Sequence, residues 1–265
     1  MIRHDEQGAD GIRLHWREWD GGTRGTLLFL HGLGADGRQF EGDAAHFADI
    51  GYRVLVPDLR GHGRSTPPDP LAFGTLRVAR LAADLSPLVV EAAPPVHLIG
   101  NSLGGLVALE LCGRHPDRIA SLCTFGTAYR LAYPPGVAAL QYGLARLLGR
   151  KRLAALVARQ ATERARPLLR NMYETADPKV MRAVQQTIRA YDYRETARRF
   201  DGPILFLSAE MDKAINRQSA PTLDTLSGKP GFRHAVIPSA GHFANLDRPE
   251  TFRAVLCGFL TSTEA

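Results

Sequence analysis

A serine flanked by glycines in the middle of the chain constrains the fold more than any other feature of the sequence. The segment Gly100-Asn101-Ser102-Leu103-Gly104 matches the pattern G-x-S-x-G. The apolar run Val96–Ile99 before it favours a buried strand, and the apolar run Leu103–Cys112 after it favours a helix. So sharp a turn forces the serine into a strained backbone conformation and requires small neighbours. The segment therefore predicts a strand–turn–helix unit that exposes a serine hydroxyl.

Short apolar runs alternate with helical patterns along most of the chain, which is typical of a parallel α/β sheet. The runs are mainly continuous, as expected of strands buried on both faces. The expected strands are Gly11–Trp19, Thr26–His31, Arg53–Pro57, Val96–Ile99, Ile119–Phe125, Pro203–Ala209 and Phe232–Pro238. The expected helices are Gln39–Ile50, Thr75–Ala92, Leu103–His115, Gln218–Leu226 and Pro249–Leu260. We therefore expect an α/β fold with a mostly parallel central sheet flanked by helices.

Residues 127–200 interrupt this alternation, because no run there has the pattern of a strand. Apolar residues recur on one helical face in Lys179–Asp192 and again in Arg152–Ala161. We interpret 127–200 as a helical cap, or lid, inserted into one core formed by 1–126 and 201–265. The alternative is that these helices simply complete the core.

Composition excludes several classes of protein. The 265 residues suffice for one large domain, and 45% hydrophobic residues are typical of a globular protein rather than a disordered one. No apolar run approaches the ~18 residues of a membrane span, and the polar N-terminus shows no secretory signal. The three cysteines lack metal-site spacing, so we expect no disulfide framework and a cytoplasmic location.

The net charge of +6 is unevenly placed. Residues 127–200 carry +10, and the remainder of the chain carries −4. No nucleic-acid-binding motif accompanies the basic residues, so we expect no nucleic-acid partner. Steering of an anionic substrate is an alternative use of this charge.

Candidate partners for Ser102 follow later strands. A serine hydroxyl needs a base, and His242 follows the expected strand Phe232–Pro238. Asp212 follows the strand before that and would orient the histidine, with Glu210 as its competitor. Asp247 is explained as a favourable charge near a helix N-terminus. The sequence therefore predicts a Ser102, Asp212 and His242 triad, in the chain order of this arrangement.

Two backbone N–H groups are candidates for an oxyanion hole, the pair of donors that an ester oxyanion requires. One belongs to Leu103, directly after the serine. The other belongs to Leu33 in His31-Gly32-Leu33-Gly34, which follows the first parallel strand. The triad supplies the proton transfers, so neither a metal nor an organic cofactor is expected.

In order and spacing these motifs resemble the α/β-hydrolase superfamily over essentially the whole chain. The resemblance implies that Asp58 and Arg60, in Pro57–Ser65, shape a structural loop and that 127–200 is the cap over the active site. Ala240–Leu246 resembles the enol-lactonase and cofactor-free haloperoxidase branch of these esterases. Haloalkane dehalogenases and epoxide hydrolases use aspartate at the position of Ser102, which argues against them. The nucleophile segment is also similar to that of carbon–carbon hydrolases, which usually carry tryptophan where this chain has Phe243.

Aromatic and methionine side chains are candidates for the substrate pocket, because six of the seven tyrosines lie in or beside 127–200. The candidates are Phe125, Tyr129, Tyr133, Tyr142, Met172, Tyr173 and Phe243. The alternative is that the tyrosines pack the cap against the core.

The sequence therefore predicts a serine hydrolase that cleaves a small-molecule carboxylic ester or lactone through an acyl-enzyme. Two alternatives remain, a carbon–carbon bond hydrolase of ring-cleavage products and a non-catalytic ligand receptor on the same fold.

Overall fold

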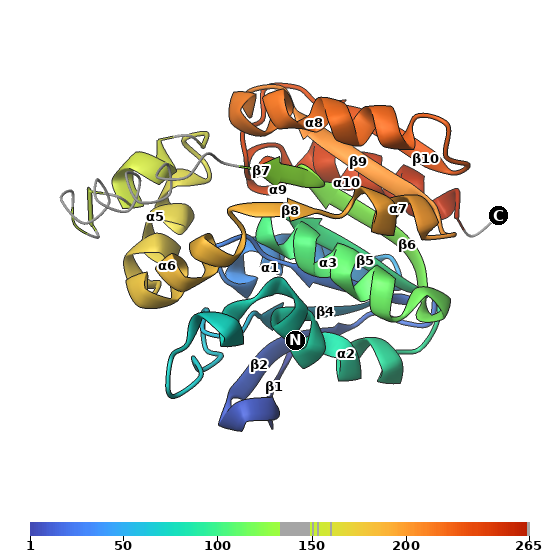
Figure 1. Ribbon diagram of the computed structural model, residues 1–265. Helices are drawn as coiled ribbons and strands as arrows, with labels where there is room; N and C mark the ends of the chain where they lie inside the picture. The colour runs from blue at the N-terminus through green and yellow to red at the C-terminus, as the bar shows by residue number, and fades with distance from the viewer. Residues whose placement is uncertain (133–148, 150, 153, 160, 264–265) are drawn as a thin grey trace.

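The computed structural model describes residues 1–132, 149, 151–152, 154–159 and 161–263, and a twisted sheet crosses its centre (Figure 1). Eight of the described strands form this sheet in the order β1-β2-β4-β3-β5-β6-β9-β10. The two pairings β1–β2 and β2–β4 are antiparallel, and the other pairings are parallel. The strands are β1 Ile2–Gln7, β2 Arg13–Asp20, β3 Thr26–Leu30, β4 Arg53–Asp58, β5 Val96–Asn101, β6 Ile119–Phe125, β9 Ile204–Ala209 and β10 Phe232–Ile237.

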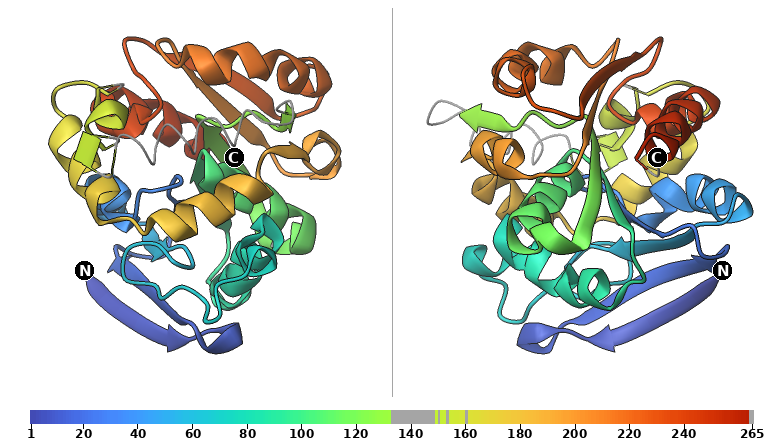
Figure 2. Two further views of the ribbon diagram at one scale, coloured as in Figure 1. Left: turned by 60° about the vertical axis from the view of Figure 1, so that its left-hand side comes forward. Right: turned by 90° about the vertical axis from the view of Figure 1, so that its right-hand side faces the viewer.

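Helices cover both faces of the sheet (Figure 2). The described helices are α1 Glu41–Asp49, α2 Val78–Glu91, α3 Leu103–Arg114, α5 Arg166–Thr175, α6 Pro178–Thr187, α7 Arg194–Arg199, α8 Lys213–Leu226, α9 Ala244–Asp247 and α10 Pro249–Thr261. Buried apolar residues of α1 and α10 pack on one face, and those of α2, α3 and α8 pack on the other. Because the middle strands are covered twice, β3 is buried at all five positions, which explains its continuous apolar run.

All seven expected strands and all five expected helices are present, with ends shifted by a few residues. The additional strand β1 was not predicted from its sequence. It lies at the edge of the sheet and is largely exposed, so its residues are polar and only backbone pairing to β2 marks it as a strand.

Two predictions for 127–200 are wrong. Short strands do occur there, because β7 Arg130–Ala132 pairs with β8 Ala190–Asp192 in a separate antiparallel sheet. The apolar stripe of Lys179–Asp192 also does not form one helix, since α6 ends at Thr187 and Tyr191 lies in β8. Its first two members, Val180 and Val184, are buried as expected. The stripe continues past the helix because β8 also places Tyr191 against the core.

The helices α5 and α6, which we call the cap helices, lie together beyond one end of the sheet (Figure 1). The next helix along the chain, α7, packs against α3 and α8 instead and so belongs with the helices of the core. The loops that follow β3, β5, β9 and β10 meet at the carboxyl end of the parallel strands, where open α/β sheets bind ligands.

Among the described residues, no helix is both long and apolar enough to cross a membrane. The three cysteines are free, and Cys112 and Cys123 are buried.

Candidate active site

Ser102 occupies the sharp turn between β5 and α3. Its backbone has φ 51° and ψ −112°, a conformation that costs a non-glycine residue energy. Neighbouring backbone leaves no space for side chains at Gly100 and Gly104. The predicted strand–turn–helix unit is therefore present, with the strain located at the serine.

His242 and Asp212 form a short polar contact beside the serine. His242 Nδ1 lies 2.7 Å from Asp212 Oδ2, and the aspartate side chain is 7% exposed against 24% for the histidine. With its Nδ1–H donated to the carboxylate, His242 keeps Nε2 available to accept a proton. The competitor Glu210 turns away and accepts a hydrogen bond from Ser239 N at 2.7 Å. The geometry therefore favours Asp212 over Glu210 as the partner of His242.

Asn101, directly before the serine, ties the histidine loop to the serine turn. Its Nδ2 donates to the backbone carbonyls of His242 at 3.0 Å and Phe125 at 3.2 Å. Gly126 permits this approach, because a Cβ there would lie 2.8 Å from Asn101 Nδ2 and 3.1 Å from the His242 ring. The sequence analysis assigned no role to Gly126; a glycine directly after an expected strand was the signal.

Gln39 connects the same turn to the loop after β3. Its Oε1 accepts from Gly32 N at 3.3 Å, and its Nε2 donates to Asn101 Oδ1 at 3.0 Å and Asn245 Oδ1 at 3.3 Å. All three amide side chains are buried, so these bonds are shielded from water. The loops that carry Gly32, Ser102 and His242 are thus held together beneath the site.

The chain of hydrogen-bonded amide side chains ends at an ion pair between Asp43 and Arg253. Asn245 Nδ2 donates to Asp43 Oδ2 at 2.8 Å, and Arg253 Nε donates to Asp43 Oδ1 at 2.7 Å. Burial raises the pKa of Asp43 to about 6 despite these two donors. The Asp43 carboxylate can therefore be buried in its ionised form only because both of its oxygens accept hydrogen bonds.

The candidate oxyanion loop, His31–Gly34, lies beside Ser102, since Gly32 and Leu33 line one pocket with the serine. His31 Nδ1 donates to the carbonyl of Gly32 at 2.9 Å, while its Nε2 accepts from Leu59 N at 2.9 Å. Burial lowers the pKa of His31, so the ring stays neutral and its tautomer is fixed. The second candidate donor, Leu103, is the first residue of α3, where an N–H has no acceptor within the helix.

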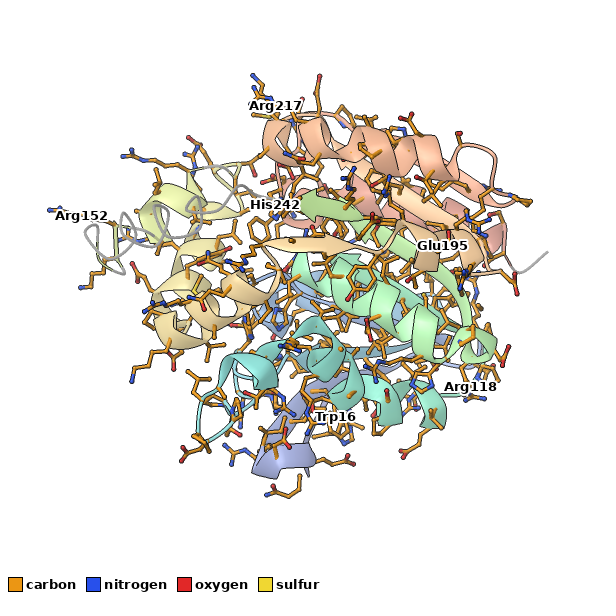
Figure 3. The ribbon with its side chains drawn as sticks, viewed as in Figure 1. Trp16, Arg118, Arg152, Glu195, Arg217 and His242 are labelled. Atoms are coloured by element: carbon orange, nitrogen blue, oxygen red, sulfur yellow. The ribbon has the colours of Figure 1, made fainter. Side chains whose placement is uncertain are left out.

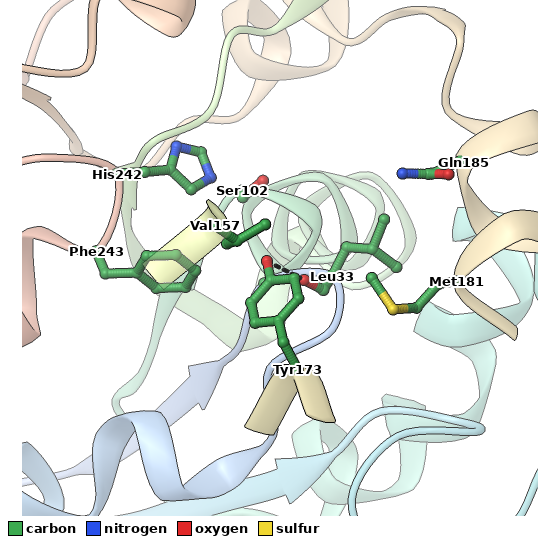
Figure 4. A pocket seen from close by; sticks show the side chains of 9 residues that line it. Leu33, Ser102, Val157, Tyr173, Met181, Gln185, His242 and Phe243 are labelled. Carbon is green, nitrogen blue, oxygen red and sulfur yellow. Dashed lines mark hydrogen bonds between the residues drawn. The ribbon is translucent and has the colours of Figure 1, made fainter. Parts of the chain in front are cut away.

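A cavity of about 240 Å³ opens between this loop, the serine and the cap helices (Figure 4). It is lined by Gly32, Leu33, Ser102, Val157, Tyr173, Met181, Gln185, His242 and Phe243. Figure 4 shows His242 and Phe243 on one side of Ser102, and Met181 and Gln185 on the other. This volume is below the roughly 300–1,000 Å³ of pockets for drug-sized ligands. The cavity suits a small substrate or the reacting end of a longer one.

Of the predicted pocket residues, Tyr173 and Phe243 line this cavity. Phe125 and Tyr129 do not, because both are fully buried in the core. Phe125 packs on Phe252 of α10, and the Tyr129 hydroxyl bonds to Thr124 Oγ1 at 2.8 Å. Both aromatic side chains therefore pack inside the core rather than at the open end of the sheet.

Met172 is also misplaced by the prediction. It is buried with Leu169 among the cap residues, and it borders a separate cavity behind the oxyanion loop rather than the one at Ser102. Tyr133 and Tyr142 lie outside the described residues.

Three lining residues were not predicted, namely Val157, Met181 and Gln185. Gln185 lies outside the apolar stripe of α6, so the sequence pattern predicts only that it is exposed to solvent. Its polar side chain beside apolar neighbours is informative only once the helix is placed over the serine.

Asp247 has a different role from the predicted one. It ends α9 rather than starting the last helix, and it accepts hydrogen bonds from Gly241 N at 2.8 Å and from Thr162 N and Oγ1, each at 2.8 Å. This buried carboxylate therefore links the histidine loop to the segment that precedes α5.

Asp58 and Arg60 have the shaping role that the resemblance implied. Asp58 is fully buried and accepts from Gly37 N at 2.7 Å and Arg64 N at 2.8 Å. Arg60 donates two bonds of 2.6 Å to Asp84. Among the residues that the structure describes, no three His, Cys, Asp or Glu side chains cluster closely enough to hold a metal ion.

Comparison with known proteins matches residues 25–249 to the family model for the alpha/beta hydrolase fold. A pimeloyl-[acyl-carrier protein] methyl ester esterase from Edwardsiella ictaluri is 29% identical over 93% of this chain and 96% of its own length. A thermophilic esterase from Thermogutta terrifontis superposes with a TM-score of 0.83 at 23% identity, covering 100% of both chains. The enol-lactonase from Burkholderia xenovorans LB400 superposes with a TM-score of 0.82 at 26% identity, covering 97% of this chain and all of the other.

Proposed function

The chain belongs to the alpha/beta hydrolase family as an ester-hydrolysing enzyme, and from that premise we propose that it uses Ser102, His242 and Asp212 as a catalytic triad on a small carboxylic ester or lactone. The observation that carries this proposal is the strained serine, which shares one cavity with a histidine bonded to a buried aspartate at 2.7 Å. The alternative receptor role gives no reason to keep such an arrangement.

In the first half-reaction Ser102 Oγ attacks the ester carbonyl carbon while His242 Nε2 accepts the hydroxyl proton. Asp212 holds the ring in place and stabilises its positive charge. The carbonyl oxygen becomes an oxyanion, which the N–H groups of Leu33 and Leu103 bind. When the carbon–oxygen bond breaks, His242 passes its proton to the leaving alcohol.

In the second half-reaction water attacks the acyl group on Ser102. His242 takes a proton from the water, and the collapse of the second oxyanion releases the acid and returns the proton to Ser102. Apart from the substrate and water, these steps use only groups that the chain itself provides.

Residues 127–200, apart from α7 on the core, are proposed as the cap, inserted between 1–126 and 201–265. Support comes from the cap helices, which supply Tyr173, Met181 and Gln185 to the wall opposite the serine turn. Because the cavity is small, short acyl groups fit it best.

A second candidate substrate is an anionic ester, such as the methyl ester of a carrier-linked acyl group that the Edwardsiella relative's name gives. The charge of 127–200, +10, favours it. Figure 3 shows Arg152 at the outer tip of this segment and His242 where the segment meets the sheet. Salt-dependent kcat/KM on an anionic ester, with salt-independent kcat/KM on a neutral one, would distinguish this substrate.

The test is hydrolysis of p-nitrophenyl esters from acetate to decanoate by the wild-type protein and by Ser102→Ala. We expect turnover of the short esters and a loss on the order of 10⁶-fold in the variant. Equal rates for both proteins would show that Ser102 is not the nucleophile.

A further inference from the structure

A turn hydrogen bond closes the candidate oxyanion loop, because Ala35 N donates to the Gly32 carbonyl at 3.1 Å. Leu33 lies between Gly32 and Gly34, and Gly34 has a φ of +76°, a backbone region in which glycine moves freely. The N–H of Leu33 must nevertheless point at the oxyanion to stabilise it, because such donors act through being oriented in advance. Hydrogen bonds from side chains to the loop carbonyls therefore help to set its direction.

Two such contacts hold the two peptide units on either side of Leu33. His31 donates to the carbonyl of Gly32 from the core side at 2.9 Å. From the cap side, the hydroxyl of Tyr173 donates to the carbonyl of Leu33 at 2.8 Å (Figure 4). Because a peptide unit is planar and trans, the bond to the Gly32 carbonyl sets the direction of the Leu33 N–H, and the bond from Tyr173 holds the following unit, between Leu33 and Gly34, in place.

The ring of Tyr173 also fills the space beside the loop. A Cβ on Gly34 would lie 2.8 Å from Tyr173 Cε1 and 2.9 Å from Met181 Cε. The other edge of the ring meets Phe243 at 6.5 Å between ring centroids, and Phe243 meets His242 at 5.3 Å. One cap side chain thus spans from the oxyanion loop to the histidine loop.

We propose that Tyr173, on α5, is a positioning residue that acts through the Leu33 carbonyl and keeps Leu33 and its N–H in the place required by the ester hydrolysis proposed above. The oxyanion hole is then complete only when the cap helix lies in its present place. Displacement of α5 removes the bond to the Leu33 carbonyl and lets the loop move, so the position of the cap controls catalysis as well as entry of substrate.

The test compares Tyr173→Phe with the matched control Tyr193→Phe. Tyr193 also joins residues 127–200 to the core, since its hydroxyl donates to Glu110 Oε2 at 3.0 Å, but it does not line the cavity. Steady-state kinetics with p-nitrophenyl acetate and butyrate give kcat and KM. Hydrogen exchange of the peptide covering residues 31–36 gives the order of the loop without reference to activity.

For Tyr173→Phe we expect a roughly two- to tenfold lower kcat on both esters with little change in KM, because a single hydrogen bond is lost. Exchange in 31–36 should be faster by a similar factor. Tyr193→Phe should match the wild type in both measurements. Wild-type kcat and wild-type exchange in Tyr173→Phe would overturn the inference, as would a change confined to KM.

The two proposals can fail separately. An inactive wild-type protein with faster loop exchange in Tyr173→Phe would reject ester hydrolysis and retain the contact as a support of the loop. An active wild-type protein whose Tyr173→Phe variant is unchanged would retain ester hydrolysis and reject the positioning role.

Discussion

The two walls of the cavity are built differently. On the core side the loops of Gly32, Ser102 and His242 are joined by the buried amides of Gln39, Asn101 and Asn245. On the cap side Val157 and Met181 are half-buried, and Gln185 is exposed. Catalysis needs groups held to within about 0.5 Å, which buried bonded loops provide. The core wall is therefore suited to the chemistry, and the cap wall, apart from Tyr173, to the choice of substrate.

Of the substitutions that compare the two walls, Asp212→Asn has the largest expected effect on kcat. Asp212→Asn keeps the shape of the side chain but favours the wrong tautomer of His242, which should lower kcat on the order of 10⁴-fold. Glu210→Gln, two residues away, removes a carboxylate bonded to Ser239 N rather than to the histidine and should leave kcat unchanged. Steady-state kinetics on p-nitrophenyl acetate measure kcat of both variants. A larger loss in the Glu210 variant would show that Glu210, rather than Asp212, orients His242.

A second effect concerns the acid stability of the core wall. His62 lies beneath the oxyanion loop beside His31, and burial lowers its pKa from 6.5 to about 4. Below pH 6.5 the unfolded chain binds a proton that the folded chain excludes, so stability falls as pH decreases from 6.5 to 4. Across this range the free energy of unfolding should decrease by an amount on the order of 3 kcal/mol.

Urea unfolding at a series of pH values checks this expectation. His62→Gln should show a smaller decrease in unfolding free energy across this window. Glu250→Gln, which removes an exposed ion pair to Arg164, should retain the wild-type slope. If the unfolding free energy depended on pH identically in the wild type and in His62→Gln, His62 would not be the group responsible.

The smallest effect is expected on the cap wall. Val157→Phe narrows the cavity and should lower kcat/KM for butyrate relative to acetate by about tenfold, the scale at which apolar pockets discriminate. Leu156→Phe makes a similar change at the neighbouring residue, which is 46% exposed and does not line the cavity, and should leave the ratio unchanged. An equal shift in both variants would show that Val157 does not contact the acyl chain.

The sequence predicts the residues that directly follow strands better than it predicts the residues that support them or that reach the cavity from the cap. Ser102, Asp212 and His242 each follow a recognisable strand, and the ends of parallel strands necessarily meet at one edge of a sheet. Gln39 gave no signal because its partner Asn245 is 206 residues away and amides carry no motif. Tyr173 and Tyr129 were indistinguishable in the sequence, since only packing decides which of two tyrosines reaches the cavity. The edge strand β1 was missed because exposed strands have no apolar pattern.

The most direct test of the account is to trap the acyl-enzyme. Wild-type protein mixed with p-nitrophenyl acetate, quenched in acid within one turnover and digested should yield one acetylated peptide, with the acetyl group on Ser102 by mass spectrometry. Ser102→Ala should yield none. Acetylation at another side chain together with undiminished turnover by Ser102→Ala would contradict the central claim that the strained serine of the core wall is the nucleophile.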